Sequence, residues 1–334
     1  MHIITPGLLT TIQDLGRWGY GQYGMPVAGA MDHDAMRLGN ILLGNPENAP
    51  VMEITILGPT ISFDHRIHFA LTGGDLQPFL NSHPISLWSV HLARPGDQLS
   101  FGGASSGCRA YLAVAGSFDV PYVMGSASTY LRGKLGGYNG RALQAGDVLV
   151  TKPTSHPTLA DLALSDDEKP RYRDVIRVIP GPQDDAFTQE GLKTFLSAEY
   201  TVSHQADRMG CRLEGPMIMH KNSADIISDG IAPGAIQVPA HGTPIIMLAD
   251  HQTTGGYTKI ATVISVDIPS VAQKKPGDTL RFEQIPVEDA QQLYREREEQ
   301  LTRLKQYITL KMRRIPSYIV TVNGQTFQGS VQEL

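Results

Sequence analysis

The sequence predicts a mainly β protein made of two similar barrel-like or sandwich-like units with a few helices. Glycine (34 residues) and proline (22) exceed their usual combined share of about 12%, and so many turn formers indicate many short strands. Helical periodicity is scarce. A heptad at 95–101 returns at 276–282 with Pro, Gly, Asp, Leu and Phe in register, and 145–149 repeats part of it. Although Pro-Gly-Asp is common turn chemistry, the repeat favours two related β units.

Seven short runs are candidate strands because they are rich in β-branched or aromatic residues and have glycine or proline at their borders. They cover 51–57, 67–71, 85–90, 109–114, 175–179, 245–248 and 260–266. Their spacing is typical of a barrel or sandwich rather than of alternating strands and helices.

Three segments carry a helical pattern. In 30–43, apolar residues recur at spacings of four, three and four; Asp32 can cap the first N–H groups, and Gly-Asn-Pro follows as a stop. A second candidate spans 184–197. The third, 287–310, is rich in charged residues and is expected to be a long, solvated helix. Its apolar positions are Leu293, Leu301, Leu304 and Tyr307.

The chain is expected to divide near its middle. Residues 152–173 hold three prolines and a charge run, which indicates a linker or exposed loop. We therefore predict an N-terminal unit at 1–151 and a C-terminal unit at 174–285. Residues 286–334 should add a helix and a short β-hairpin.

Composition excludes several classes of protein. The net charge of −5, without a basic stripe, argues against nucleic-acid binding. No apolar run of about 18 residues predicts a spanning helix, and the N-terminus lacks the features of a signal peptide. Cys108 and Cys211 lie far apart and outside any C-x-x-C motif, so neither a disulfide framework nor a zinc site is expected. A cytoplasmic protein without a membrane partner is the default.

Polar clusters supply the candidate functional residues, and the first lies at 11–17. Gln13, Asp14 and Arg17 cannot all be core residues. Asp14 can orient Arg17, and the Arg17 guanidinium can hold a carboxylate in bidentate fashion. A surface salt bridge is the alternative, and the sequence favours neither.

The second cluster combines hydroxyls with a guanidinium. Gly125-Ser-Ala-Ser-Thr129 is followed by Arg132 and by a glycine pair at 136–137. Such donors suit an oxyanion or a carboxylate, whereas a hydroxyl-capped turn is an equal alternative.

Two further clusters lie in the second half of the chain. Asp207 and Arg208 resemble an anion clamp, but neighbours on a strand point to opposite faces, so a shared role requires a turn. The run 250–257 follows an apolar strand and is rich in polar and glycine residues, a composition typical of functional loops. His251 is the one histidine within these clusters, and no histidines stand at metal-ligand spacing, so we predict no metal.

Motifs in the same order along the chain resemble the biotin-dependent carboxyltransferase family, also called allophanate hydrolase subunit 2 or KipA-like. The resemblance covers 3–285. It rests on motifs at 11–20, 24–32, 40–45, 71–75, 111–116, 125–129, 140–141, 207–210, 228–230, 234–239, 250–257, Gln273 and 276–278.

This resemblance implies a fold of two cyclophilin-like β-barrel units. A similar stand-alone bacterial chain is the C subunit of an ATP-dependent 5-oxoprolinase. It opens 5-oxoproline to L-glutamate with two partner subunits, which are KipI-like (B) and LamB/YcsF-like (A). One alternative is a carboxyltransferase that passes a carboxyl group from carboxybiotin to urea or a related amide. The other is a KipA-like antagonist of a KipI-type kinase inhibitor.

The resemblance implies ATP together with the partner subunits, and a small anionic amide as substrate. No Met-Lys-Met biotinylation sequence is present, so no biotin is expected on this chain. Residues 318–334 nevertheless resemble the opening hairpin of a biotin-carrier domain. A vestige of such a domain and an unrelated extra hairpin remain equal interpretations.

The family motifs also imply roles for individual residues. Arg17 and Arg208 are expected to clamp a carboxylate, since a guanidinium can hold one in bidentate fashion. Thr129 and the backbone of Gly255 and Gly256 are expected to donate hydrogen bonds to an oxyanion. Asp14 and Asp250 are expected to orient the arginines and the oxyanion donors, or to move protons. The remaining substrate-binding candidates are Gln13, Arg132, Gln252, Thr254 and Tyr257. We expect these loops to surround one small anionic guest in a common hollow.

Overall fold

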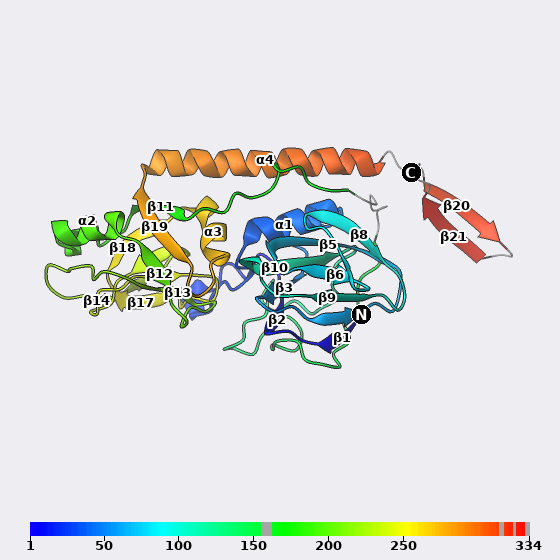
Figure 1. The fold of residues 1–334 in the computed structure, drawn as a ribbon, viewed down its shortest axis with the longest axis horizontal. Coiled ribbons are helices and arrows are strands. Elements are labelled where there is room, and N and C mark those ends of the chain that lie inside the picture. Colours follow the sequence, from blue (N-terminus) through cyan, green and yellow to red (C-terminus); the bar gives the residue numbers. More distant parts are fainter. Residues whose placement is uncertain (155–161, 314–316, 323–324, 331–334) are drawn as a thin grey trace.

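The computed structural model describes residues 1–154, 162–313, 317–322 and 325–330. The fold is mainly β, with few helices, as predicted (Figure 1). Strands β1 to β10 build two sheets in the first half of the chain, and β11 to β19 build a closed barrel and a two-stranded ribbon in the second half.

The first half consists of two five-stranded sheets that share one hydrophobic core. Their orders are β1-β4-β9-β6-β7 and β2-β3-β10-β5-β8. Ile3 and Leu99 from one sheet and Ile12 and Leu112 from the other are buried in the same cluster. The strands are β1 (His2–Thr5), β2 (Leu9–Gln13), β3 (Val51–Thr55), β4 (Thr60–Ser62), β5 (Ile67–Asp75), β6 (Pro78–Leu80), β7 (His83–Pro84), β8 (Ser89–Ala93), β9 (Gln98–Phe101) and β10 (Ser106–Val114).

The second half is a seven-stranded closed barrel in the order β11-β18-β15-β16-β13-β12-β19. It closes through the parallel pairing of β11 with β19. A separate ribbon pairs β14 with β17. The strands are β11 (Val175–Pro180), β12 (Tyr200–Val202), β13 (Gly210–Glu214), β14 (Asp225–Gly230), β15 (Ala235–Gln237), β16 (Ile245–Met247), β17 (Thr254–Tyr257), β18 (Lys259–Val263) and β19 (Thr279–Gln284).

The repeated Pro-Gly-Asp heptads form the same turn in both halves, as the sequence predicted. Asp97 accepts a hydrogen bond from the backbone N–H three residues earlier at 2.7 Å, and Asp278 does the same at 3.0 Å. Asp147, in the partial repeat, accepts the equivalent bond at 2.7 Å. The middle glycines all have positive φ, which favours glycine. The chain then enters β9 and β19 at the two full repeats.

Helix α1 (His33–Leu42) confirms the first helix prediction, because the Asp32 carboxylate accepts the N–H of Ala35 as its N-cap. The second prediction is partly wrong. A 3₁₀ turn at Asp184–Ala186 and helix α2 (Gln189–Ser197) replace one continuous helix. Phe187 between them is extended and fully buried. Burial of that ring therefore overrides the local helical pattern.

The strand predicted at 85–90 is also partly wrong. Strand β8 begins only at Ser89, because Trp88 has φ of +59° and breaks the extended chain. The described part of the predicted linker lies against this region. Leu162 accepts the N–H of Val90, and the Leu164 N–H bonds to the carbonyl of Trp88. Leu164 is buried there.

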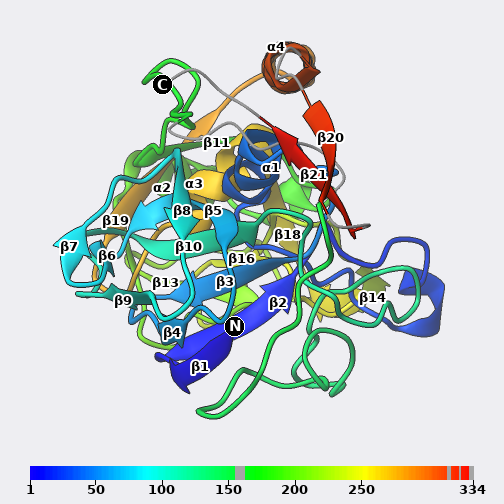
Figure 2. The ribbon, with the colours of Figure 1, turned by 90° about the vertical axis from the view of Figure 1, so that its right-hand side faces the viewer.

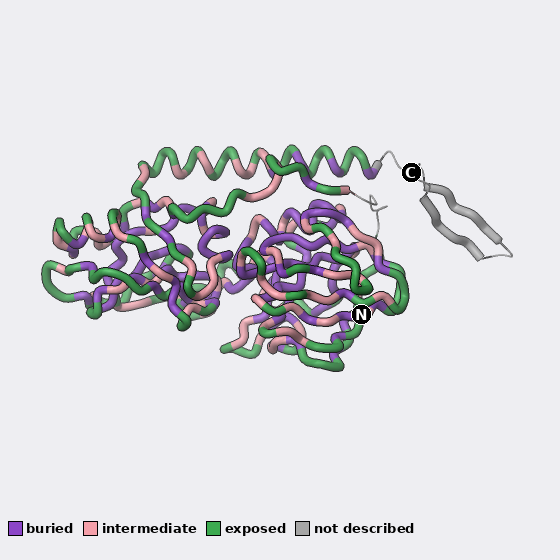
Figure 3. The backbone as a smooth tube through the Cα atoms, in the orientation of Figure 1, coloured by how far each residue is buried: buried purple, intermediate pink, exposed green. Residues whose placement is uncertain are grey.

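Helix α4 (Val287–Arg313) runs across both halves (Figure 1). Figure 2 shows it end-on above α1, and Figure 3 shows the exposed stretches that alternate with buried ones along it. Of its predicted apolar positions, Leu301 and Leu304 are buried together with Ile308, whereas Tyr307 is 52% exposed.

Two short pieces complete the helices, namely α3 (Ile268–Ala272) and a 3₁₀ turn at Ser265–Asp267. Beyond α4, β20 (Ser317–Val322) and β21 (Gln325–Ser330) pair as an antiparallel hairpin. No described helix is long and apolar enough to cross a membrane.

Candidate functional site

The first two predicted clusters are joined by Asp14. Its Oδ1 accepts from the N–H of Gly16 at 2.8 Å, from Ser126 Oγ at 2.6 Å and from Ser128 Oγ. Its Oδ2 accepts from the N–H of Ala127 at 2.6 Å. The buried carboxylate therefore fixes the 126–128 turn against the end of β2, and it forms no ion pair with Arg17. These contacts give Asp14 a structural role in place of the predicted one.

Thr129 and Gln13 also face the protein interior. The Thr129 hydroxyl donates to the carbonyl of Ile12 at 2.9 Å, and Thr129 is fully buried. Gln13 Nε2 donates to Thr11 Oγ1 at 2.9 Å and to the Thr129 carbonyl at 3.2 Å. Because its one proton is already used, the Thr129 hydroxyl is not placed to donate to an oxyanion.

Arg17 is the largest fully buried side chain of the described residues, with 1% exposure. Its Nη2 donates to the carbonyl of Ser128, whereas Nε and Nη1 are buried without a hydrogen-bond partner among the described residues. Burial lowers the pKa of Arg17, and the charges of Asp14 and Asp250 oppose that effect. Two N–H-bearing nitrogens of Arg17 thus remain unused beside the 128–136 turn.

Arg208, the second predicted carboxylate clamp, is fully engaged by the protein. Its Nε and Nη2 bond to the two oxygens of Asp250, each at 3.0 Å, in a bidentate pair. Its Nη1 donates to Glu53 on β3, and Nη2 also donates to the carbonyl of Gly29 at 2.6 Å. Burial opposes the charge, but the two carboxylates outweigh it and raise the pKa of Arg208. The guanidinium that was expected to hold substrate instead ties the two halves together.

Sequence reasoning missed the partners that complete this junction. Glu53 is 1% exposed and also accepts from the Met31 N–H at 2.8 Å and the Tyr111 hydroxyl at 2.9 Å. Gln273, from the C-terminal half, donates to Asp32 at 2.8 Å and accepts the N–H groups of residues 108 and 109. The sequence did contain one signal for this junction, namely Glu53 inside the otherwise apolar strand predicted at 51–57. A buried carboxylate is rarely left unpaired, so its position indicated a buried cation or hydrogen-bond donor nearby.

Beside this junction lies a hollow of about 320 Å³. Arg132 reaches it from the N-terminal half, and the remaining walls come from the barrel and from the loop and strand at 252–257. Its lining residues are Arg132, Asp207, Met209, Gly210, Arg212, Gln237, Pro239, His241, Ile245, Met247, Gln252 and Tyr257. Of the predicted site residues, this hollow unites Arg132, Gln252 and Tyr257. The expectation that Arg17, Thr129 and Arg208 line the same hollow was wrong.

The hollow carries an excess of unpaired positive charge. Neither the Arg132 nor the Arg212 side chain forms a hydrogen bond or ion pair with a described residue, and both residues are exposed. The single carboxylate, Asp207, has Oδ1 occupied by the N–H groups of Met209 (2.8 Å) and Gly210 (3.1 Å). Asp207 and Arg208 diverge at this turn, so they share no clamp. Two free guanidinium groups beside a partly used carboxylate suit a small anion.

The two glycines predicted to donate to an oxyanion, Gly255 and Gly256, lie outside the lining of the hollow. Gly255 and Gly256 belong to β17, which pairs with β14 through Asp229↔Gly255 and Gly230↔Thr254. They do not line the hollow. A Cβ added at Gly255 would lie 2.8 Å from Nε2 of Gln237. Glycine here therefore leaves room for the Gln237 side chain.

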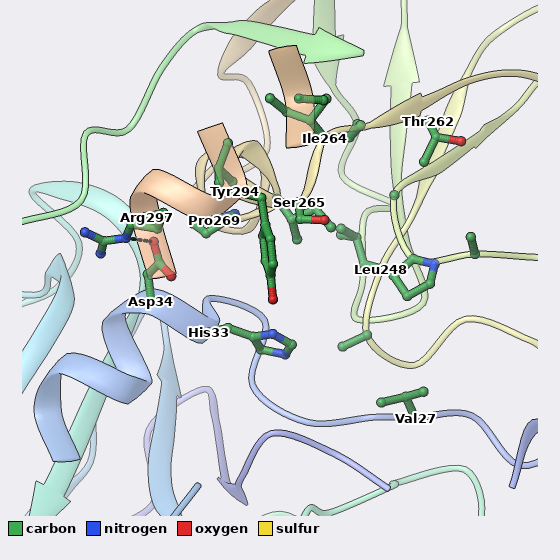
Figure 4. A pocket seen from close by; sticks show the side chains of 18 of the residues that line it. Val27, His33, Asp34, Leu248, Thr262, Ile264, Ser265, Pro269, Tyr294 and Arg297 are labelled. Atoms are coloured by element: carbon green, nitrogen blue, oxygen red, sulfur yellow. Dashed lines mark hydrogen bonds and ion pairs between the residues drawn. The ribbon is translucent and has the colours of Figure 1, made fainter. Parts of the chain in front are cut away.

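A larger cavity of about 840 Å³ lies between the two halves, below the first part of α4 (Figure 4). Its walls are mostly apolar, and Tyr294 of α4 extends toward His33 at the start of α1. Asp34 and Arg297 form an ion pair at 2.7 Å at its edge. None of the predicted site residues lines it, whereas Met247 contributes to both cavities.

Among the described residues, no group of three or more His, Cys, Asp or Glu side chains is arranged to hold a metal ion. Cys108 and Cys211 are both buried free thiols. Burial raises the pKa of Cys211 to about 12, so it carries little thiolate near neutral pH.

The chain has clear relatives. The sequence-family model of the carboxyltransferase domain, subdomain A and B, matches residues 23–284 of this chain. The chain is 38% identical to the C subunit of 5-oxoprolinase from Haemophilus influenzae, over 90% of this chain and 96% of that protein. The C subunit of Escherichia coli 5-oxoprolinase is 37% identical over 87% and 93%. The structure of Kluyveromyces lactis urea carboxylase matches with a TM-score of 0.85 and 31% identity, over 91% of this chain but 29% of that chain.

Proposed function

The chain belongs to the family of the carboxyltransferase domain, subdomain A and B, and on this premise we propose that it is the C subunit of a 5-oxoprolinase, which opens 5-oxoproline to L-glutamate. Two relatives of that name match it over nearly their whole length. The resemblance read from the sequence motifs leads to the same activity.

The observation that carries this proposal is the small hollow with two unpaired arginines. 5-Oxoproline is a five-membered lactam that bears one carboxylate. Arg132 and Arg212 supply guanidinium groups for that carboxylate, and no described residue competes for them. A volume of about 320 Å³ lies at the lower end of the range for small-ligand sites.

The chemical task sets what the chain must provide. Water adds to the lactam carbonyl carbon, the ring C–N bond breaks, and the nitrogen takes a proton to become the amine of glutamate. Amide resonance makes this step slow without activation. Residues that fix the carboxylate orient the ring, and donors near the carbonyl oxygen stabilise the charge that develops there.

ATP fits this chain poorly. The hollow offers two arginines but no glycine-rich phosphate loop, and the described residues hold no cluster of carboxylates for a metal ion. We therefore assign ATP to the two partner subunits, KipI-like (B) and LamB/YcsF-like (A), and propose that turnover requires all three. We also retain the cytoplasm as the proposed location.

Carboxyl transfer to urea is the second candidate, because the fold matches that of a urea carboxylase with a TM-score of 0.85. Urea has no carboxylate, so it leaves the two arginines of the hollow without the partner that 5-oxoproline supplies. A KipA-like antagonist of a kinase inhibitor would need neither substrate.

The test is turnover by the chain assembled with its partner subunits, measured as glutamate formation from 5-oxoproline with ATP and as consumption of urea with and without biotin. Arg132→Ala should lower kcat/KM on 5-oxoproline by about 10- to 100-fold, the usual effect of losing a charged hydrogen bond. The control Arg281→Ala removes an arginine that is 61% exposed and pairs with Glu199, and neither residue lines the hollow. This control should leave the rate unchanged. Biotin-dependent turnover of urea, or complex formation without any turnover, would overturn the proposal.

A further inference from the structure

We propose that Gln237 recognises the lactam edge of the substrate, with Nε2 donating to the ring carbonyl and Oε1 accepting the ring N–H. This inference rests on the proposed function, which it deepens by naming the group that reads the amide. Gln237 lies in the family motif at 234–239 but had no role in the sequence-based site.

The register of the barrel directs Gln237 outward, toward the hollow. It is the last residue of β15, and it pairs with Ile245 on β16 and Lys259 on β18. Its neighbour Ile236 is fully buried in the barrel core. Because successive side chains on a strand point to opposite faces, Gln237 stands on the outer face. It lines the hollow there and is only 2% exposed.

The carboxamide of Gln237 makes no hydrogen bond with the described part of the chain. Its Nε2 is closed off from solvent and has no hydrogen-bond partner among the described residues. Donation to a ligand therefore requires the amide to turn toward the hollow that Gln237 lines. Its surroundings are apolar, since the outer-face cluster consists of Ile231, Ala235, Met247 and Ile245. A buried polar group normally finds a partner, and an unused one at the wall of a cavity points to a ligand.

Glycine at 255 leaves room for this amide. A Cβ there would lie 2.8 Å from Gln237 Nε2 and 2.7 Å from Ile231 Cδ1, with Gln252 Nε2 3.6 Å away. Any larger residue would push against the amide from behind. The glycine that was predicted to donate its backbone to an oxyanion therefore acts through Gln237.

A primary carboxamide is the complement of a lactam. The small ring holds its N–H and C=O on the same edge, one donor beside one acceptor, and the end of a glutamine side chain presents the opposite pair. With the carboxylate on Arg132 and Arg212, the two recognition elements contact opposite parts of one small molecule. Nε2 then lies at the oxygen where negative charge develops during water attack.

Three carboxylates separate these contributions. Cyclopentanecarboxylate keeps the ring and the acid but lacks the amide, and 3-oxocyclopentane-1-carboxylate restores the carbonyl without the N–H. Binding is measured by calorimetry on the chain assembled with its partner subunits, without ATP. The wild type should bind 5-oxoproline most tightly and lose about tenfold in affinity for each hydrogen bond removed.

Gln237→Leu should bind all three ligands equally, near the wild-type affinity for cyclopentanecarboxylate. Gln237→Met is the second variant, should the branched side chain disturb folding. Gln292→Leu, on the exposed face of α4, is the matched control and should keep the wild-type order.

The outcomes distinguish this inference from the proposed function. If Arg132→Ala weakens all three ligands while Gln237→Leu keeps the preference for 5-oxoproline, the role of Gln237 is refuted and the anion site stands. If the wild type binds none of the three, the proposed function fails and the inference fails with it.

Discussion

Replacing Arg208 with methionine tests whether this arginine holds the two halves together or holds substrate. Methionine keeps an unbranched side chain of similar length and removes the charge. Four hydrogen bonds disappear, two to Asp250, one to Glu53 and one to the Gly29 carbonyl. The carboxylates of Glu53 and Asp250 then remain with only 1% and 7% of their side chains exposed, and each has lost its ion pair with Arg208.

The magnitude follows from that burial. Removing one partner of a buried ion pair costs about 3–5 kcal/mol, because an uncompensated charge stays in the interior. At about 2–4 °C per kcal/mol for a chain of this size class, Arg208→Met should lower the Tm by roughly 10 °C. The backbone contact between Ala28 and Ala249 at 3.0 Å crosses the same junction and should loosen with it.

Calorimetric unfolding provides the assay, with Arg281→Met as the matched control. The Arg281–Glu199 pair is 61% and 49% exposed, and such surface pairs contribute about 0–1 kcal/mol. A double variant, Arg208→Met with Glu53→Gln, should lose less than the sum of its single variants, because the second change removes one stranded charge.

Two results would refute this reasoning. A Tm for Arg208→Met within a degree or two of the control would show that the buried network does not join the halves. An unchanged Tm with lost binding of 5-oxoproline would restore the clamp role that the sequence suggested.

Three further predictions concern the same region. Burial raises the pKa of Asp32 from 3.8 to about 6, although its hydrogen bonds oppose the shift. The folded state therefore favours the protonated carboxyl, and the stability that Asp32 contributes is present below about pH 4 and is lost as pH rises through 6. In urea titrations, the free energy of unfolding of the wild type relative to Asp32→Asn should fall by up to about 3 kcal/mol between pH 4 and 8. Gly136→Ala would place a Cβ 2.1 Å from the Ser128 carbonyl oxygen, whereas the Cβ of Gly125→Ala would meet no atom within 4 Å, so that this second variant has only the cost of a positive φ. Gly136→Ala should therefore unfold at a clearly lower urea concentration than Gly125→Ala. Equal unfolding midpoints would contradict this. Arg37→Met removes the ion pairs to Glu47 (2.8 Å) and Glu298, and should speed hydrogen exchange in α4 while leaving exchange in the barrel strands unchanged.

The local structure was largely predictable because it depends on neighbouring residues. The Pro-Gly-Asp turns formed as expected, since each aspartate caps a backbone N–H three residues away. Asp32 capped α1 for the same reason. Local rules failed where a distant contact prevailed, as at Phe187, whose ring packs 4.6 Å from that of His220 and interrupts the helix.

The candidate site was predicted only in part. The clusters at 11–17, 125–132, 207–210 and 250–257 do meet at the junction between the halves. The sequence could not say which of their charges face each other and which face a cavity. Arg132 remains free of partners among the described residues, whereas Arg208 finds two carboxylates, one of them 155 residues away along the chain.

The sequence by itself determined six of the seven candidate strands, the Pro-Gly-Asp turns, the first helix cap and the family, because each follows from residue type at short range or from ordered motifs. Only the tertiary structure decided the roles of the polar residues. An arginine or an amide can bind a ligand only if the folded protein leaves it a hollow and no partner, and those two conditions depend on residues from both halves of the chain.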